Sequence, residues 1–209
     1  WHIWFTDQPK EHAYIRNAGT MMDRNLGATS ATPGDVGALG LFYQWGRQDP
    51  FLGASSISSE TEAKSTITWP SPVWSDSSTG TITYATTNPT TLIDGNDYNY
   101  DWYYTGSSST NNSRWTSLSK TKSIYDPCPA GWRVPGHSVF GLPFGSLVSY
   151  DCSYDSAGKG MNFAGELGFV GSPIWYPAAG RSVGNSLWSV GKSGDYWTAS
   201  TYNYIALSL

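Results

Sequence analysis

The sequence predicts an α+β domain in which short strands and loops outweigh two short helices. Ser, Thr, Gly, Trp and Tyr are abundant and Lys and Glu are scarce, which is typical of a loop-rich β protein. Long helical periodicity is nearly absent, and Gly and Pro separate a series of short strand-like segments. With 209 residues, the chain is expected to form one domain with a substantial hydrophobic core.

The N-terminal part is predicted to contain a hairpin and the first helix. Residues 2–6 alternate as a strand does, and residues 19–26 supply a second strand after a turn near Asn17. Asp35 is then expected to cap a helix that ends at Gly46. The apolar side chains of this helix follow at helical spacing: Val36, Leu39, Phe42 and Trp45.

A long Ser/Thr-rich insertion is predicted at residues 53–122. It is broken by prolines and contains clusters of Trp and Tyr. Closing a long loop costs only about 0.6 kcal/mol for each doubling of its length, whereas exposed aromatic rings need a surface to cover. We therefore expect an ordered insertion that lies over the domain.

Beyond the insertion, the chain is predicted to return to short elements. Residues 132–134 are expected to form a strand, and Pro135 to open a second short helix that Pro143 ends. Further short strands, separated by Gly and Pro, are expected at Phe163, 168–170, 174–176, 195–200 and 204–209.

The charge balance excludes several classes of partner. Charged residues make up 13% of the chain against the usual ~25%, and the formal net charge is only -4. There is thus no basic stripe for nucleic acid or for an anionic membrane surface. No apolar run approaches the roughly 20 residues of a membrane span, so membrane insertion is not expected. The composition favours an exported, extracellular or cell-surface protein whose signal lies upstream of this segment.

The last part of the chain has the composition of a binding surface. Residues 175–209 place Trp and Tyr among Ser, Gly, Asn and Thr, with few charges. Rigid amphipathic rings between small hydrogen-bonding residues are typical of antibody paratopes, because they offer contact area at a low cost in conformational entropy. We therefore predict that this region contacts a ligand.

Several motifs together carry a resemblance to one bacterial family. They are MDRNLGATS at 22–30, GLFYQWGRQDPF at 40–51, YDPCPAGWRVP at 125–135, PAAGR at 177–181 and GDYWTAS at 194–200. The chain resembles the C-type-lectin-fold domains of fimbrillin-like surface proteins, is similar to the variable proteins of diversity-generating retroelements, and more distantly resembles formylglycine-generating enzymes. The resemblance implies a single domain over 1–209, with two short helices, a twisted antiparallel sheet and ligand contacts at 175–209.

The resemblance also implies which C-terminal residues face the ligand. In the retroelement relatives, framework residues stay fixed while exposed positions between them vary. Framework positions here are Pro177, Ala178, Ala179, Gly180, Tyr196 and Trp197. The ligand-binding positions that remain are Arg181, Val183, Asn185, Trp188, Lys192, Thr201, Tyr202, Asn203 and Tyr204.

The aromatic residues are expected to divide between core and surface. Tyr202, Asn203 and Tyr204 stand between two strand-like runs, which favours exposure. A core position is favoured for aromatics inside strand or helix patterns, namely Trp4, Trp45, Trp132, Trp175 and Trp197.

The chain departs from the family at its carboxyl end. The family continues into a final strand that pairs beside the N-terminal strand, whereas this sequence ends at Leu209. Residues 2–6 are therefore expected to lack that neighbour, which leaves an unpaired edge.

The sequence offers little for catalysis or metal binding. Ser138 and His137 lack the pattern of a nucleophile elbow, and the histidines lack metal-ligand spacing. Asp97, Asn99 and Asp101 have the spacing of a calcium loop, but the Gly and Glu that such a loop needs are missing. The calcium motifs of sugar-binding C-type lectins are also missing. No metal or cofactor is predicted.

The two cysteines leave alternatives open. Cys128 and Cys152 could form a disulfide, remain separate thiols, or leave Cys128 to a partner beyond this segment. Formylglycine-generating enzymes use a closely spaced pair of C-terminal cysteines, which this chain does not have.

The sequence therefore predicts a non-catalytic, adhesin-like recognition domain at the bacterial surface, and the resemblance implies diversification by a retroelement. Its ligand is an unknown protein or glycan bound through the C-terminal face. The alternatives are a structural fimbrial subunit that joins other subunits by strand exchange, and, less favoured, a formylglycine-generating-type enzyme.

Overall fold

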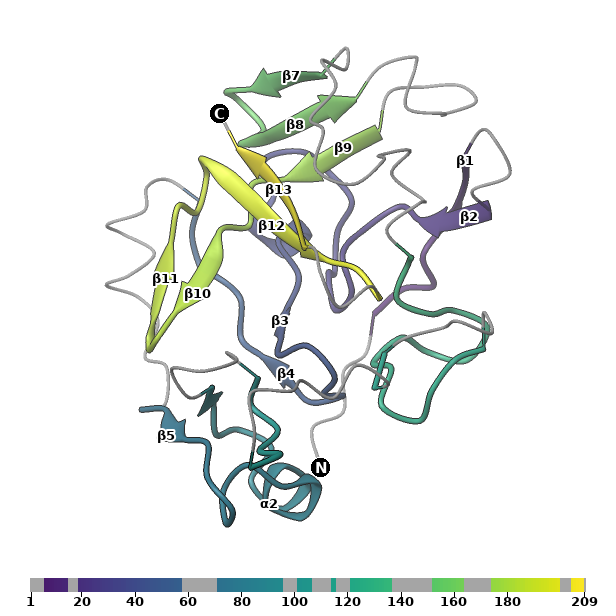
Figure 1. Ribbon diagram of the computed structural model, residues 1–209. Coiled ribbons are helices and arrows are strands. Elements are labelled where there is room, and N and C mark those ends of the chain that lie inside the picture. Colours follow the sequence, from purple (N-terminus) through teal and green to yellow (C-terminus); the bar gives the residue numbers. More distant parts are fainter. Residues whose placement is uncertain are drawn as a thin grey trace.

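A computed structural model describes residues 6–14, 19–57, 71–95, 101–106, 114–115, 121–136, 152–163, 174–199 and 204–208. Short strands and loops make up most of this part, together with one short α-helix (Figure 1). The predicted α+β fold with two helices, a C-type-lectin-like domain, is therefore wrong. The chain forms a small sheet-rich fold instead.

Among the described residues, the largest sheet has three antiparallel strands in the order β7-β8-β9. The turn between β7 and β8 is held by Asp155, whose Oδ1 accepts from the backbone N–H groups of Ala157 and Gly158 at 3.0 and 2.9 Å. The strands are β7 (Cys152–Asp155), β8 (Gly160–Phe163) and β9 (Ile174–Pro177).

Two antiparallel hairpins follow β9, and Figure 1 shows them at the centre and on the left of the molecule. The strands predicted near 174–176, 195–200 and 204–209 are confirmed within a few residues at each end. The bounds are β10 (Arg181–Val183), β11 (Ser186–Trp188), β12 (Ser193–Trp197) and β13 (Tyr204–Ser208).

The chain crosses itself closely where β9 leads into β10. Gly180 forms a bridge with Gly194 and has a φ of 78°. A Cβ on Gly180 would stand 2.4 Å from the carbonyl oxygen of Trp188, so a side chain does not fit there. This close crossing fixes the position of β10 relative to β12.

The N-terminal hairpin differs from the predicted one. β2 (Gly19–Met22) pairs antiparallel with β1 (Glu11–Tyr14). The predicted partner at 2–6 lies almost wholly outside the described residues. The strand Glu11–Tyr14 is not among the predicted elements.

The predicted helix after Asp35 is a single turn. Asp35 does act as the N-cap, since its Oδ1 accepts from Gly37 N at 2.9 Å, but the 3-10 helix η1 spans only Val36–Ala38. Gly40 then takes a φ of 75°, which ends the turn and leads the chain into a strand. The next strands are β3 (Phe42–Tyr43) and β4 (Pro50–Phe51).

Residues 132–134, predicted as a strand, are not in one. The second predicted helix, at 135–143, falls mostly outside the described residues, and 135–136 are not helical. The backbone here follows hydrogen bonds to Asp126 instead, because the Oδ2 of Asp126 accepts from Val134 N at 2.8 Å.

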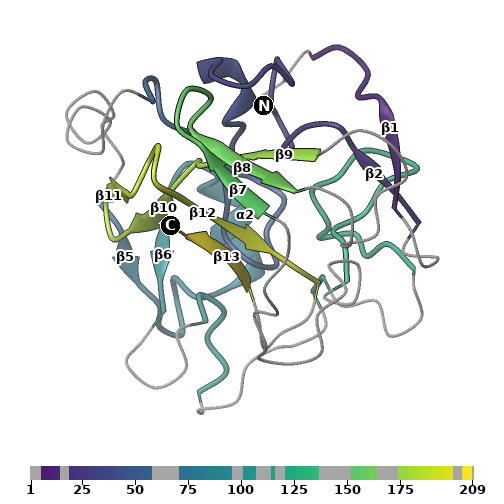
Figure 2. The same ribbon diagram turned by 90° about the horizontal axis from the view of Figure 1, so that it is seen from above.

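The described part of the insertion folds into elements of its own. Thr81 caps the α-helix, accepting from Tyr84 N at 3.0 Å, and a parallel pair of short strands flanks it. In both views the β10–β11 hairpin lies near β5 (Figures 1 and 2). The bounds are β5 (Val73–Trp74), α2 (Ile82–Thr87) and β6 (Ile93–Asp94).

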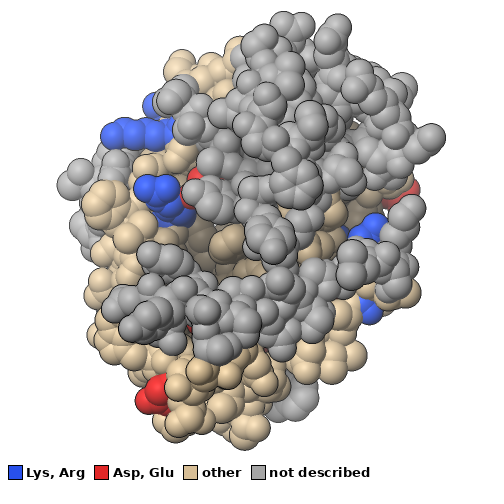
Figure 3. Space-filling view, in the orientation of Figure 1, with Lys and Arg blue, Asp and Glu red and all other residues tan. Residues whose placement is uncertain are grey.

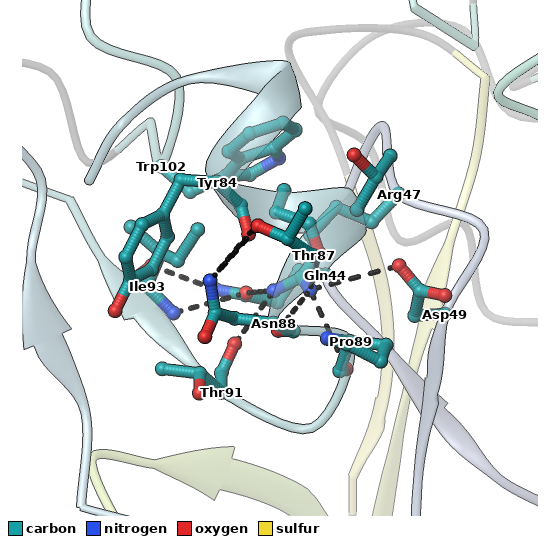
Figure 4. A network of polar contacts seen from close by, with 12 residues as sticks. Gln44, Arg47, Asp49, Tyr84, Thr87, Asn88, Pro89, Thr91, Ile93 and Trp102 are labelled. Carbon is teal, nitrogen blue, oxygen red and sulfur yellow. Dashed lines mark hydrogen bonds and ion pairs between the residues drawn. The ribbon is translucent and has the colours of Figure 1, made fainter. Parts of the chain in front are cut away.

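Arg47 fastens the insertion to the rest of the fold. Its side chain is 3% exposed and donates to Gln44 Oε1 at 2.7 Å and to the carbonyl oxygen of Thr91 at 2.8 Å. Its second terminal nitrogen faces carbonyl oxygens at and beyond the end of α2, at Ala85 and Asn88 (Figure 4). The guanidinium thus adds donors at the C-terminal end of α2, next to the C-cap residue Asn88.

Three indole N–H groups connect the segments around β3. Trp102 Nε1 donates to the carbonyl oxygen of Trp45 at 2.8 Å, and Trp45 Nε1 donates to that of Thr198 at 3.0 Å. Trp197 Nε1 donates to the carbonyl oxygen of Tyr43 at 2.9 Å. These bonds connect the insertion, the β3 region and the end of β12 to one another.

No helix in the described part is long and apolar enough to cross a membrane.

Candidate functional site

The β10–β11 hairpin carries most of the predicted contact residues that the structure describes. A two-residue turn at 184–185 joins its strands, and Gly184 has a φ of 56°, as the first central residue of a type II′ turn requires. Directly paired residues point to the same side of a hairpin. On one such side lie Arg181, Val183, Ser186 and Trp188.

This side of the hairpin faces solvent. Val183 is 46% exposed and Trp188 41% exposed, and Arg181 is also exposed. Leu187 points the other way and is 1% exposed, packed in the same core cluster as Val190. We call Arg181, Val183 and Trp188 the hairpin face. It is an outward surface held from behind by the hydrophobic core.

The other predicted contact residues lie in turns, at the start of β13 or outside the described part. Asn185 in the hairpin turn and Lys192 in the turn after β11 are both exposed. Tyr204 opens β13, where its backbone pairs with Trp197. The remaining predicted positions fall outside the described residues: Thr201, Tyr202 and Asn203.

A groove of about 730 Å³ runs beside β10. Ligand pockets commonly have volumes of roughly 300–1,000 Å³. Figure 3 shows this face hollowed near its middle, with few charged side chains among the described residues that it colours. The groove is formed by β3, β6, β10, β12 and the segment at 101–102, and its lining includes Tyr43, Trp45, Asp94, Arg181, Val183 and Trp197.

Trp197 is a groove residue that the sequence reading placed in the core. Its side chain is 44% exposed, although the bond from its Nε1 to Tyr43 holds the ring in place. Strand periodicity could not separate core from groove here, because Trp197 is the last residue of β12. Trp45, Trp132 and Trp175 are half-buried rather than fully buried, and Trp4 lies outside the described residues.

One ion pair joins the hairpin face to the groove. Arg181 Nη1 lies 3.7 Å from Asp195 Oδ2, and the two side chains are 51% and 17% exposed. Burial raises the pKa of Asp195 above its ordinary value, and the charge of Arg181 opposes that rise. The guanidinium therefore helps to keep a carboxylate ionised at the wall of the groove.

Replacing Arg181 with glutamine should raise the pKa of Asp195 further. A raised pKa means that the folded state binds the proton more tightly than the unfolded state. Asp195 therefore contributes most to stability at low pH, where it is protonated, and this contribution is lost as the pH rises through its folded pKa. The loss is larger in the variant, because its Asp195 pKa is higher. A carboxyl-carbon NMR titration measures this pKa. Lys122→Gln, which removes a cation paired with Asp126, is the matched control, and an unchanged Asp195 pKa in Arg181→Gln would contradict the assignment.

Two further carboxylates line the groove. Asp101, predicted as one position of a weak calcium pattern, forms an ion pair with Arg114 Nη2 at 2.5 Å, so its charge is matched by a buried cation. Asp97 and Asn99 lie outside the described residues. Asp94 ends β6 and is half-buried, and no described side chain hydrogen-bonds to its carboxylate. Asp94 is thus a carboxylate available to a ligand in the groove.

The described residues contain no cluster of His, Cys, Asp and Glu that could hold a metal ion. Cys128 is a free thiol, so the disulfide with Cys152 is not formed. Burial and the neighbouring Asp126 raise the pKa of Cys128 to about 12, so its thiol stays protonated at neutral pH. A protonated thiol is a poor nucleophile.

The sequence does not predict the groove, but two residues of its lining, Arg181 and Val183, are among the predicted contact residues. The sequence predicts Trp45 and Trp197 as core residues and predicts no contact role for Asp94 and Asp195. The available signal was the Gly184–Asn185 pair between two short alternating runs, which is a known hairpin pattern. Comparison with known protein families, curated proteins and solved structures gives no match for this chain.

Proposed function

We propose that this chain is a non-catalytic recognition domain that binds a protein or glycan through the hairpin face and the groove beside it, as an adhesin does at the bacterial surface. The observation that supports it best is the register of the β10–β11 hairpin, which puts Arg181, Val183 and Trp188 on one exposed side.

The physical chemistry of the hairpin face suits recognition. Trp and Arg are the residue types most enriched among the side chains that dominate binding energy. Trp188 and Arg181 are direct cross-strand partners, so the strand pairing holds them next to each other before a ligand arrives. A pre-organised contact surface loses little conformational entropy on binding. The low charge of the chain leaves shape and apolar contact as the main sources of affinity.

Replacing Trp188 with alanine should weaken ligand binding by at least about tenfold, because central aromatic contacts commonly contribute 2 kcal/mol or more. The melting temperature should change by less than about 2 °C, since Trp188 is exposed and Leu187 supports the hairpin from behind. The probes are two printed panels, one of glycans and one of bacterial and host extracellular proteins. Binding is then measured by surface plasmon resonance on every probe retained.

Trp74→Ala is the matched control, because Trp74 is 66% exposed but lies on β5, outside the hairpin face. It should leave binding unchanged. Equal binding by wild type and Trp188→Ala would refute the proposal. A fall of several degrees in the melting temperature of Trp188→Ala would show that the ring stabilises the fold instead.

A further inference from the structure

The exposed ring of Trp197 is held more firmly than a surface tryptophan usually is. Its Nε1 donates to Tyr43 at 2.9 Å, and the residue after it, Thr198, accepts from Trp45 Nε1 at 3.0 Å. The backbone and one edge of the ring are thereby fixed, while the residue is 44% exposed and forms part of the groove lining. A fixed aromatic face is a stacking platform for another flat or ring-shaped group.

The polar groups near this platform suit hydroxyl groups. Asp94 contributes a carboxylate to the lining, and Arg181 and Asp195 contribute a donor and an acceptor 3.7 Å apart. Gln44 also lines the groove, but its amide is already occupied by both backbone groups of Ile93. Vicinal hydroxyls donate strongly to carboxylates and accept from a guanidinium, so adjacent hydroxyls of one ring match these groups.

The charge of the groove disfavours anions. With Asp101 matched by Arg114, the remaining charged side chains among the described lining residues are the carboxylates of Asp94 and Asp195 and the guanidinium of Arg181. The charge of these described residues is slightly negative, which disfavours a phosphate, sulfate or carboxylate group on the ligand. The described residues also offer no metal cluster through which an anionic or neutral sugar could be held.

We propose that the groove binds a neutral saccharide without a metal ion, with one sugar ring stacked on Trp197 and its hydroxyls bonded to Asp94 and to the Arg181–Asp195 pair. The C–H groups of a sugar face carry partial positive charge, which the negative face of an indole attracts. This inference rests on the proposed recognition function and names the ligand class for the groove.

The test titrates the whole chain with neutral and anionic probes in the presence of a chelator. The neutral probes are maltopentaose, cellopentaose, mannopentaose and chitopentaose, and the anionic ones are sialyllactose and a heparin oligosaccharide. Calorimetry gives the affinity, and the indole N–H resonance of Trp197 reports the place of binding. We expect at least one neutral probe to bind with a dissociation constant below about 1 mM and to shift that resonance.

Trp197→Ala should weaken binding of that probe by at least about tenfold, and Asp94→Asn by about tenfold. Asp94 makes no described side-chain hydrogen bond, so the Asp94→Asn variant keeps the test valid if Trp197→Ala fails to fold. Trp74→Ala is again the control. Binding of only anionic probes, selection of only peptides from a random library, or binding that survives both substitutions would overturn the inference.

The two proposals fail separately. If Trp188→Ala loses a surface ligand that Trp197→Ala and Asp94→Asn still bind normally, the hairpin face is the recognition surface and the proposal for the groove is refuted. Loss of neutral-sugar binding in Trp197→Ala with no effect of Trp188→Ala would do the reverse.

Discussion

Replacing Arg47 with alanine is expected to destabilise the fold by about 3–5 kcal/mol, because it removes the buried partner of several polar groups at once. Arg47 donates to Gln44 Oε1 at 2.7 Å and to the carbonyl oxygens of Thr91 and Ala85 at 2.8 and 3.2 Å. Figure 4 shows these bonds converging on one guanidinium. Without it, the carbonyl groups stay buried and lose their donor.

Asn88 and Arg47 share the carbonyl groups at the end of α2: Asn88 Nδ2 donates to Tyr84 at 3.0 Å, and Arg47 donates to Ala85 at 3.2 Å. α2 has six residues, and the last four carbonyl groups of any helix have no partner within the helix. A charged donor at that end also interacts favourably with the helix dipole. Arg47 further stacks on Phe51 and Trp102, with its guanidinium carbon 5.4 and 5.8 Å from their ring centres. Removing the side chain should therefore loosen both the insertion and the floor of the groove.

Urea unfolding of wild type and variants measures this effect. Arg47→Lys should fall between wild type and Arg47→Ala, because lysine keeps the charge but lacks the planar fork that reaches several acceptors. Arg181→Ala is the exposed-arginine control and should cost less than about 1 kcal/mol. A loss below about 1 kcal/mol in Arg47→Ala would show that the insertion is held by its apolar contacts alone.

The fate of the region after Asp35 shows where sequence patterns lose their power. Asp35 caps as expected, but the apolar residues that suggest one helix belong to two different cores. Leu39 packs with Phe51 in one cluster, whereas Trp45 packs against Trp115 in another. Spacing along the chain cannot tell one helical face from a bent segment that serves two cores. The glycines in the segment are the sequence signal that indicates the bend.

The opposite error occurred in the insertion. The segment Ile82–Thr87 is rich in threonine, which has low helix propensity, and no helix is predicted there. It forms α2 with support at both ends. Thr81 caps its start, and Arg47, 38 residues away in the sequence, donates to the carbonyl oxygen of Ala85 near its end. Such support from a distant side chain is invisible to any local pattern.

The strands near the carboxyl end were easier to predict. Ile174–Pro177 and Tyr204–Ser208 combine β-branched or aromatic residues with clear boundaries, and both form strands. The candidate site was predicted less well, because exposure depends on which side of a hairpin packs on the core. The Arg181–Trp188 pairing decides that question for the hairpin face, and the end of β12 decides it for Trp197.

Replacing Asp126 with asparagine should destabilise the fold by about 2–4 kcal/mol, which corresponds to a fall of roughly 5–15 °C in melting temperature. The Asp126 side chain is buried, and its two oxygens accept separately. Oδ1 accepts from Cys128 N at 2.9 Å and from Lys122 Nζ at 2.8 Å, and Oδ2 accepts from Val134 N at 2.8 Å. An amide has one oxygen and one NH₂ group, so at least one of these donors would face another donor.

This carboxylate explains why the YDPCPAGWRVP segment holds its shape without regular secondary structure. It ties the two ends of the segment together, and Ala199 N then donates to the carbonyl oxygen of Pro135 at 2.8 Å, two residues beyond Trp197. Lys122→Met is the matched control, since Lys122 is partly exposed and its loss should cost less than about 1 kcal/mol. A melting temperature of Asp126→Asn within about 2 °C of wild type would contradict this assignment. Solvent would then satisfy the donors, and the segment would not depend on the Asp126 carboxylate for its position.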